Sequence, residues 1–177
     1  SKGDDYVIRK NMLKDQAQMA RIKIDGWRTA YDKIVASKYL KSLNYEQQTK
    51  RYIASFEEYK DIVLVADRND EILGYSCFEP NCKDEKYDAE LISLYTKPGH
   101  TGKGIGTNLF KETAKELLSQ GRQNIIVWCF ANNDNAIKFY ENLGGKNVES
   151  KNVNIGNKSY LEHGFYFDLN EVVDNEF

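Results

Sequence analysis

Three closely spaced glycines, Gly102, Gly104 and Gly106, constrain the fold of this chain more than any other feature. They lie between an apolar run that ends at Thr96 and a segment after residue 108 whose apolar residues recur at helical spacing. A strand, a glycine-rich turn and a helix in this order are typical of α/β proteins. In such a turn, successive backbone N–H groups point at one spot beside the helix N-terminus, where they bind anions.

The periodicity of the rest of the chain indicates a mixed α/β fold. Apolar residues at spacings of three and four between Leu13 and Ile34 predict a helix, with Gly26 as a point where it could split in two. Apolar and β-branched runs predict buried strands at 62–66, 72–78, 89–96 and 125–129. Together these segments predict a single mixed α/β domain over residues 1–177.

The last third of the chain continues this pattern. The polar residues 133–135 offer a cap for a helix over 136–143, which two glycines then end. Two further strands are expected near 146–153 and 159–169. The acidic segment from Glu171 onward is expected to be a loosely held tail.

Composition excludes several classes of function. The 177 residues include 25 basic and 27 acidic ones, a net charge of −2, and no polybasic block, which disfavours nucleic acid as a partner. No apolar run reaches the ~20 residues of a membrane span. Three cysteines without a C-x-x-C pair, and two histidines, predict no metal site and a reducing, cytoplasmic location.

The charge is unevenly distributed. Between Lys97 and Lys146 the chain has seven basic and four acidic residues, although the chain as a whole is acidic. This local excess is expected if the segment binds a small anionic ligand. A solvated helix face would account for most of the same lysines, and both interpretations remain open at this point.

Two common phosphate-binding motifs do not match the glycine cluster. A P-loop requires G-x-x-x-x-G-K-[ST], but Lys103 is followed by Gly104, and residue 97 is a lysine. A dinucleotide fingerprint requires G-x-G-x-x-G, and counting from Gly102 places Thr107 at the third glycine. The alternative without a ligand is a tight turn in which the glycines are incidental.

The segment Leu91–Thr107, LISLYTKPGHTGKGIGT, resembles the acetyl-CoA signature of the GCN5-related N-acetyltransferases (GNAT). The usual core of that signature is R/Q-x-x-G-x-G/A, and residues 101–106 read TGKGIG. Thr101 therefore replaces a long polar side chain, while the backbone amides that bind pyrophosphate in this family are retained.

A second segment strengthens the resemblance. Residues 133–144, NDNAIKFYENLG, are similar to the family's N-x-x-A-x-x-F-Y-E-x-L-G motif, although Gly145 stands where an aromatic residue usually follows. Helical spacing explains Ala136, Phe139 and Leu143 as core residues without any resemblance. The two motifs together imply a GNAT-like fold, with a mixed and mostly antiparallel sheet flanked by helices.

The resemblance assigns chemical roles to individual residues. Tyr140 would protonate the leaving thiolate, and Glu90, in a segment similar to one that carries the base in some members, would accept the amine proton, with a water chain as the alternative. Asn133 would bind the pantetheine or a phosphate. The remaining residues expected to bind acetyl-CoA are Leu94, Tyr95, Thr96, Thr101, Gly102, Lys103, Gly104, Ile105, Gly106 and Thr107.

The expected activity is therefore transfer of an acetyl group from acetyl-CoA to an amine by direct attack, without a metal. Trp27 and Tyr31 would line the acceptor site, together with the loop 79–88 and the turn 149–157. The acceptor could be a small molecule or a protein, and the oligomeric state is not predicted. The alternatives are an acyl-CoA-binding module without turnover and, with less support, a nucleotide-dependent phosphotransferase.

Overall fold

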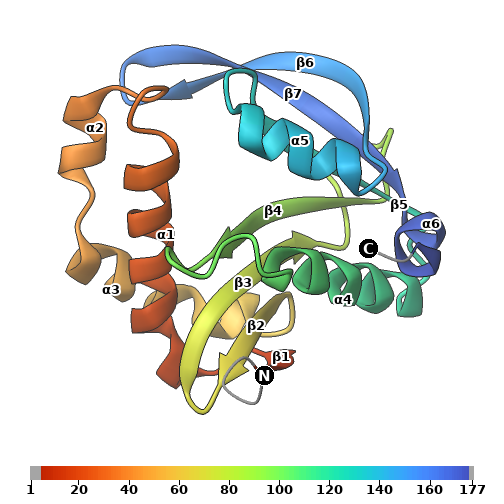
Figure 1. Ribbon diagram of the computed structural model, residues 1–177, viewed down its shortest axis with the longest axis horizontal. Coiled ribbons are helices and arrows are strands. Elements are labelled where there is room, and N and C mark those ends of the chain that lie inside the picture. Colours follow the sequence, from red (N-terminus) through yellow and green to blue (C-terminus); the bar gives the residue numbers. More distant parts are fainter. Residues whose placement is uncertain (1–4, 176–177) are drawn as a thin grey trace. The chain divides into compact units, whose positions relative to one another are not determined.

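Seven strands form one sheet, and the helices of the described residues lie before the second strand or after the fourth along the chain (Figure 1). The computed structural model describes residues 5–175. The strands are β1 (Val7–Lys10), β2 (Val63–Arg68), β3 (Glu71–Glu79), β4 (Ala89–Thr96), β5 (Asn124–Phe130), β6 (Lys146–Ile155) and β7 (Lys158–Asp168). The helices are the 3₁₀ helix η2 (Leu13–Asp15), α1 (Gln16–Ala30), α2 (Ser37–Ser42), α3 (Tyr45–Tyr59), α4 (Ile105–Ser119), α5 (Asp134–Asn142) and α6 (Leu169–Asp174).

The strand order in the sheet is β1-β2-β3-β4-β5-β7-β6. The pairs β1–β2, β2–β3, β5–β7 and β6–β7 are antiparallel, whereas β4 and β5 are parallel. The expected class, an α/β fold with a mixed and mostly antiparallel sheet flanked by helices, is therefore confirmed.

The described residues divide into two compact units. The N-terminal unit consists of residues 5–77 and Ser93–Glu112, and the C-terminal unit consists of Phe78–Ile92 and residues 113–175. The strands β3 and β4 and the helix α4 each contribute residues to both units.

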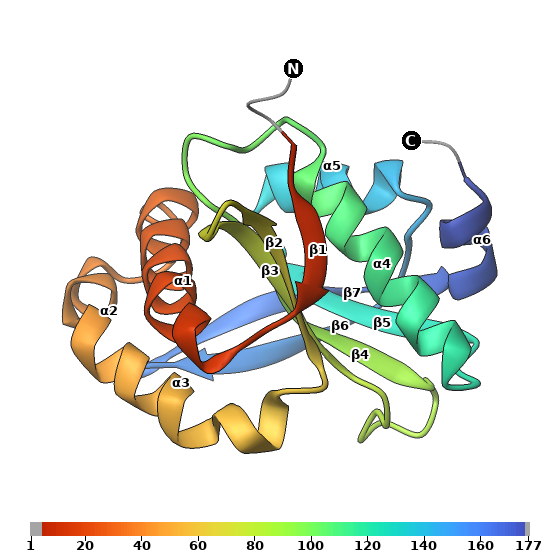
Figure 2. The same cartoon turned by 90° about the horizontal axis from the view of Figure 1, so that it is seen from below.

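The N-terminal unit has a core between helix α1 and the hairpin of β2 and β3. Helices α1 and α3 pack side by side (Figure 2). Met19 and Ile22, one turn apart on α1, are buried among apolar strand residues. The strand residues of this core are Val63, Val65, Ile72 and Tyr75.

The long helix predicted from Leu13 is shorter than expected at both ends. Residues 13–15 form η2, and α1 continues through Gly26 and stops at Ala30. Beyond it, the backbone N–H groups of Ile34 and Val35 both donate to the carbonyl of Tyr31, which forms a turn in place of further helix. Gly26 does not interrupt the helix.

In the C-terminal unit, the tail expected to be loose is a helix. The side chain of Asp168 accepts hydrogen bonds from the N–H groups of Asn170 and Glu171 and so caps α6. Leu169 and Val172 are buried on one side of it. The expectation was wrong for Glu171 to Asp174, because the helix is held by two buried apolar residues three positions apart, although most of its other residues are polar or acidic. Residues 176–177 lie outside the described part of the chain.

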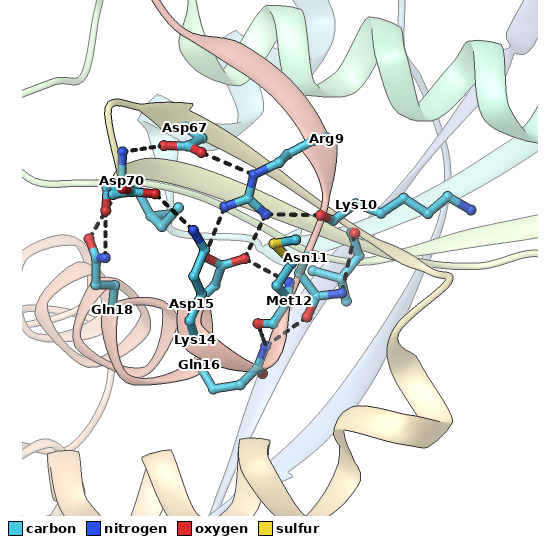
Figure 3. Close-up of polar contacts among 12 residues, drawn as sticks. Arg9, Lys10, Asn11, Met12, Lys14, Asp15, Gln16, Gln18, Asp67 and Asp70 are labelled. Carbon is cyan, nitrogen blue, oxygen red and sulfur yellow. Dashed lines mark hydrogen bonds and ion pairs between the residues drawn. The ribbon is translucent and has the colours of Figure 1, made fainter.

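A network of charged side chains connects β1 to η2 and β2 in the N-terminal unit (Figure 3). The Arg9 guanidinium donates two hydrogen bonds to the Asp15 carboxylate, at 2.8 and 2.9 Å, and one to Asp67 at 3.0 Å. These two carboxylates raise the pKa of Arg9. The Asp15 side chain is only 2% exposed, and it also accepts from the backbone N–H of Met12 at 2.7 Å.

Replacing Arg9 by Met should therefore lower the free energy of unfolding by about 3 kcal/mol, because it leaves the buried carboxylate of Asp15 without its counter-charge. Urea unfolding followed by circular dichroism measures this loss. Lys14→Met is the matched control, since it removes the equally short but exposed ion pair with Asp70 and should leave the midpoint unchanged. Equal midpoints for Arg9→Met and the wild-type protein would contradict this view of the network.

Candidate active site

The glycine turn has the backbone conformation that an anion-binding turn requires. Gly102 and Gly104 have φ angles of +76° and +83°, in the left-handed region that favours glycine. A Cβ atom added at either position would meet nothing within 4 Å. Gly102 and Gly104 are therefore needed for their backbone angles rather than for space, and a tight turn requires these angles with or without a bound anion.

Helix α4 begins directly after this turn. Ile105 is 3% exposed and anchors the first turn of the helix, and the Asn108 N–H donates to the Gly104 carbonyl at 2.9 Å. The amides of Ile105, Gly106 and Thr107 are among the first of the helix, which lack intrahelical acceptors. With the exposed side chains of Thr101 and Lys103, they form a positively polarised backbone surface in the N-terminal unit.

Close packing of two strands positions the end of β4, with Leu94, Tyr95 and Thr96, relative to β3. A Cβ added at Gly74 would lie 2.7 Å from the Tyr95 carbonyl oxygen, and the Lys97 N–H donates to the Leu73 carbonyl at 2.8 Å. The parallel pairing of β4 with β5 covers Ala89–Leu91 opposite Ile125–Val127. Beyond that point β4 continues to Thr96.

Two aromatic residues predicted for the acceptor site lie together in the N-terminal unit. The rings of Trp27 and Tyr31 contact edge to face with centroids 4.9 Å apart, and the Trp27 Nε1–H donates to the Tyr95 hydroxyl at 2.8 Å. Burial raises the pKa of Tyr95, whose ring also packs on Tyr75. The side chain of Tyr95 thus belongs to an aromatic cluster with Trp27, which leaves its main chain for the predicted cofactor contact.

A depression in the surface is lined by residues that neighbour Trp27 and Tyr31 in the sequence. It has a volume of about 400 Å³ and opens to solvent, and its lining residues are Arg28, Asp32, Ser37, Leu40 and Lys41. Arg28 is held there by hydrogen bonds to the carbonyls of Leu40 and Leu43. None of the residues predicted from the sequence lines it.

In the C-terminal unit, helix α5 carries Asn133 and Tyr140. The Asn133 side-chain oxygen accepts from the Ala136 N–H at 3.2 Å, which makes Asn133 the N-cap of the helix, as predicted. Tyr140 is 8% exposed, and its ring lies 6.1 Å, centroid to centroid, from those of Phe165 and Phe167. The predicted acid is therefore held rigidly, and the predicted cofactor ligand also has a structural role.

The structure explains why glycine occupies position 145, where the family motif usually has an aromatic residue. A Cβ at this position would lie 2.6 Å from Cζ of Phe167 and 2.8 Å from the carbonyl oxygen of Tyr140. The Phe167 ring from β7 fills the space that a side chain at 145 would need. The departure at Gly145 is thus compensated by an aromatic residue from another strand.

Glu90, the predicted base, is half-buried on β4 in the C-terminal unit. Burial raises the pKa of Glu90, whereas the positive charge of Lys151 and a hydrogen bond from the Cys82 thiol, at 3.8 Å, oppose the rise. A carboxylate with a raised pKa is suited to accept a proton near neutral pH.

Glu90 and Tyr140 lie on opposite faces of the sheet within this unit. Glu90 is paired with Ile126, and the next residue, Leu91, with Val127, which in turn pairs with Phe165. Because successive side chains of a strand alternate between faces, Phe165 lies on the face away from Glu90. Tyr140 packs on that face through its contact with Phe165.

Trp128 on β5 and Glu162 on β7, which sequence analysis did not single out, lie on the same face of the sheet as Glu90. Lys151 on β6 shares this face and belongs to the segment 149–157 that was expected at the acceptor site. The charge of Lys151 lowers the pKa of both Glu90 and Glu162, and the charge of Glu90 raises that of Glu162. No local pattern marks Trp128, which stands in an apolar strand, and the register that aligns the strands was not readable from the sequence.

Two features are absent among residues 5–175, a cluster of possible metal ligands and a helix able to span a membrane. This part of the chain has no group of three or more His, Cys, Asp or Glu side chains placed to hold a metal ion. In the same range, every helix is too short or too polar to cross a bilayer. Burial raises the pKa of the Cys129 thiol to about 11, which disfavours a reactive thiolate there.

The chain is similar in sequence to known acetyltransferases. A model of the acetyltransferase (GNAT) family matches residues 27–144. The chain is 28% identical over 159 residues to the uncharacterized N-acetyltransferase YuaI of Bacillus subtilis, covering 89% of this chain and 90% of that protein. It is 25% identical over 146 residues to the spermidine N(1)-acetyltransferase of Thermoplasma acidophilum, covering 78% and 87%.

Solved structures share the fold. The PaiA N-acetyltransferase of Thermoplasma acidophilum, in complex with coenzyme A, superposes with a TM-score of 0.73 at 20% identity, covering 90% of this chain and 98% of that one. The ribosomal-protein-alanine N-acetyltransferase of Brucella melitensis superposes with a TM-score of 0.69 at 20% identity, covering 92% and 99%.

The packing around Gly145 leads to a stability prediction. Gly145→Ala should lower the free energy of unfolding by about 1–3 kcal/mol, because the new methyl group overlaps the Phe167 ring and a backbone oxygen. A double-mutant cycle with Phe167→Leu, measured by denaturant unfolding, should recover part of this loss, since the ring is one of the two obstacles. Strictly additive effects of the two substitutions would show that the ring does not restrict position 145.

Proposed function

The chain belongs to the acetyltransferase (GNAT) family, and from this premise we propose that it transfers an acetyl group from acetyl-CoA to a primary amine. The family match, over residues 27–144, includes both the glycine turn and Tyr140. The enzyme class expected from the sequence, an acyltransferase, is confirmed by this membership. The observation that carries the proposal is the pair of left-handed glycines at the N-terminus of α4.

The residues of the turn fit the anionic part of acetyl-CoA. The amides of residues 101–107 provide hydrogen-bond donors for a pyrophosphate, and the helix N-terminus and Lys103 add positive potential. Open space at Gly102 and Gly104 leaves room for phosphate oxygens to approach the backbone. The main chain of Leu94, Tyr95 and Thr96 would pair with the pantetheine, and a backbone N–H in this segment would polarise the thioester carbonyl.

The chemistry then requires two proton transfers. The acetyl group is supplied as a thioester, and the amine nitrogen forms the new C–N bond as the C–S bond breaks. Glu90 accepts the proton that the amine loses, and the Tyr140 hydroxyl gives a proton to the leaving sulfur.

The comparisons support the choice of reactants. A curated relative is named for acetylation of spermidine, an amine. The solved PaiA structure, which shares the fold, holds coenzyme A. We also propose that the two units act as a single catalytic domain, because the assigned roles fall in both. A cytoplasmic location without a nucleic-acid partner stays a prediction.

The proposed activity is tested by release of free thiol from acetyl-CoA across a panel of amines. Release should depend on the amine and fall by about 100-fold or more in Tyr140→Phe, because the leaving thiolate loses its proton donor. Tyr59→Phe, on the exposed end of α3, is the matched control and should keep full activity.

Thermal shift with acetyl-CoA separates the alternatives. Stabilisation by acetyl-CoA without thiol release from any amine would favour the acyl-CoA-binding module. No stabilisation at all would contradict the assignment of the glycine turn. Stabilisation by ATP and Mg²⁺, but not by CoA, would favour the phosphotransferase.

The raised pKa of Glu90 predicts the pH dependence of the reaction. Glu90 must be deprotonated to act as the base, and its pKa lies above the ordinary value of 4.5. We therefore expect kcat/KM to decrease as the pH is lowered through the pKa of Glu90. Glu90→Gln should lower kcat/KM and remove its decrease at low pH. Glu58→Gln, which changes an exposed carboxyl group on α3, is the control. If kcat/KM of Glu90→Gln decreased at low pH as in the wild-type protein, a water chain would be the acceptor of the amine proton.

A further inference from the structure

One face of the sheet in the C-terminal unit carries an aromatic ring with a lysine ammonium on it. The Trp128 ring lies close to Gly164 of the neighbouring strand, since a Cβ at Gly164 would be 2.9 Å from two of its ring atoms. The Lys151 Nζ atom lies 4.0 Å from the centroid of the same ring. Glycine at 164 thus lets the ring approach the backbone, where its π-face interacts with the cation.

Two half-buried carboxylates belong to the same face. Glu162 is paired with Phe130 and with Lys151 in the register of β5, β7 and β6, and Glu90 is paired with Ile126. Residues 126, 128 and 130 alternate onto one face of β5, and their partners share it. Glu90 and Glu162 therefore lie on the side of Trp128 and Lys151, across three neighbouring strands.

The charges of this face are mutually dependent. Burial raises the pKa values of Glu90 and Glu162, and the positive charge of Lys151 counteracts both rises. None of the salt bridges of 4.0 Å or less within the described residues joins Lys151 to either carboxylate. The Lys151 side chain is exposed, so its ammonium can leave the ring at little cost, whereas the two carboxylates are held on their strands.

We propose that the acceptor is a primary alkylammonium ion that binds where the Lys151 ammonium now lies, on the Trp128 ring beside Glu90 and Glu162. This inference rests on the proposed function and names its substrate class. A lysine side chain is itself a linear alkylammonium, and it already occupies this place. Lys151 competes with the acceptor, and Glu162 is a specificity residue that draws the cation toward Glu90.

The same charges disfavour other amines. An acceptor that carries a carboxylate at the other end of its chain would bring that negative charge toward Glu90 and Glu162, which repel it. An arylamine is uncharged at neutral pH and gains nothing from the two carboxylates. A second ammonium on the acceptor is compatible with this face. Once Lys151 has moved away, one ammonium balances only one of the two carboxylates, and the other can bind a second positive charge.

The test compares three linear amines of similar length: 1,5-diaminopentane, pentylamine and 6-aminohexanoate. In Lys151→Met, which keeps the stem and removes the charge, KM for 1,5-diaminopentane should fall about threefold or more. In Glu162→Gln, KM should rise by about the same factor. 6-Aminohexanoate should be the poorest acceptor, and Lys151→Met should not improve it. Lys158→Met, an exposed lysine of the same hairpin, is the control.

Calorimetric binding of 1,5-diaminopentane separates this inference from the proposed function. Tighter binding to Lys151→Met and weaker binding to Glu162→Gln support the site even if no acetyl group is transferred. Acetyl transfer to amines with KM and Kd unaffected by either substitution would overturn the inference and leave the proposed function intact. It would also be overturned if 6-aminohexanoate were the best acceptor and lost affinity in Lys151→Met, because Lys151 would then bind a carboxylate.

Discussion

The positive φ angles of Gly102 and Gly104 are the constraint on which the proposed chemistry depends. They turn the chain from the end of β4 into helix α4, so that the first amides of the helix and those of the turn are presented together. Any other residue at these positions would have to adopt a strained backbone, whatever space surrounds it. The replacement at Thr101 matters less in this view, because the donors are main-chain groups.

Close packing holds the segments and side chains to which we assign roles in the reaction. The near contact of Gly74 with the Tyr95 carbonyl oxygen and the bond from Trp27 to the Tyr95 hydroxyl hold the end of β4 in place. In the C-terminal unit, Tyr140 is packed on Phe165 and Phe167. In the mechanism that we propose, groups packed in this manner need little reorganisation during the reaction, which is one way in which enzymes lower barriers.

The parts of the site that depend on local sequence were predictable. The glycine turn, the Asn133 cap, helix α5 and the strands that flank them follow from spacing and turn chemistry within a few residues. The resemblance then assigned roles that no local rule provides, such as that of Tyr140.

The parts that depend on distant residues were not predictable. The cluster of Trp128, Lys151 and Glu162 arises from the register of β5, β7 and β6, which a single sequence does not specify. The role of Phe167 beside Gly145 has the same origin, because it requires knowledge of which strand packs under α5. Helix α6 was missed because its two apolar anchors stand among acidic residues.

The central claim is that the turn at residues 101–107 binds the pyrophosphate of acetyl-CoA, and calorimetric titration tests it most directly. Acetyl-CoA should bind about 100-fold more tightly than S-acetylpantetheine, which presents the same thioester without the pyrophosphate. In Gly104→Ala most of this difference should disappear, because the backbone donors are displaced. Equal affinity of the wild-type protein for the two compounds would contradict the account.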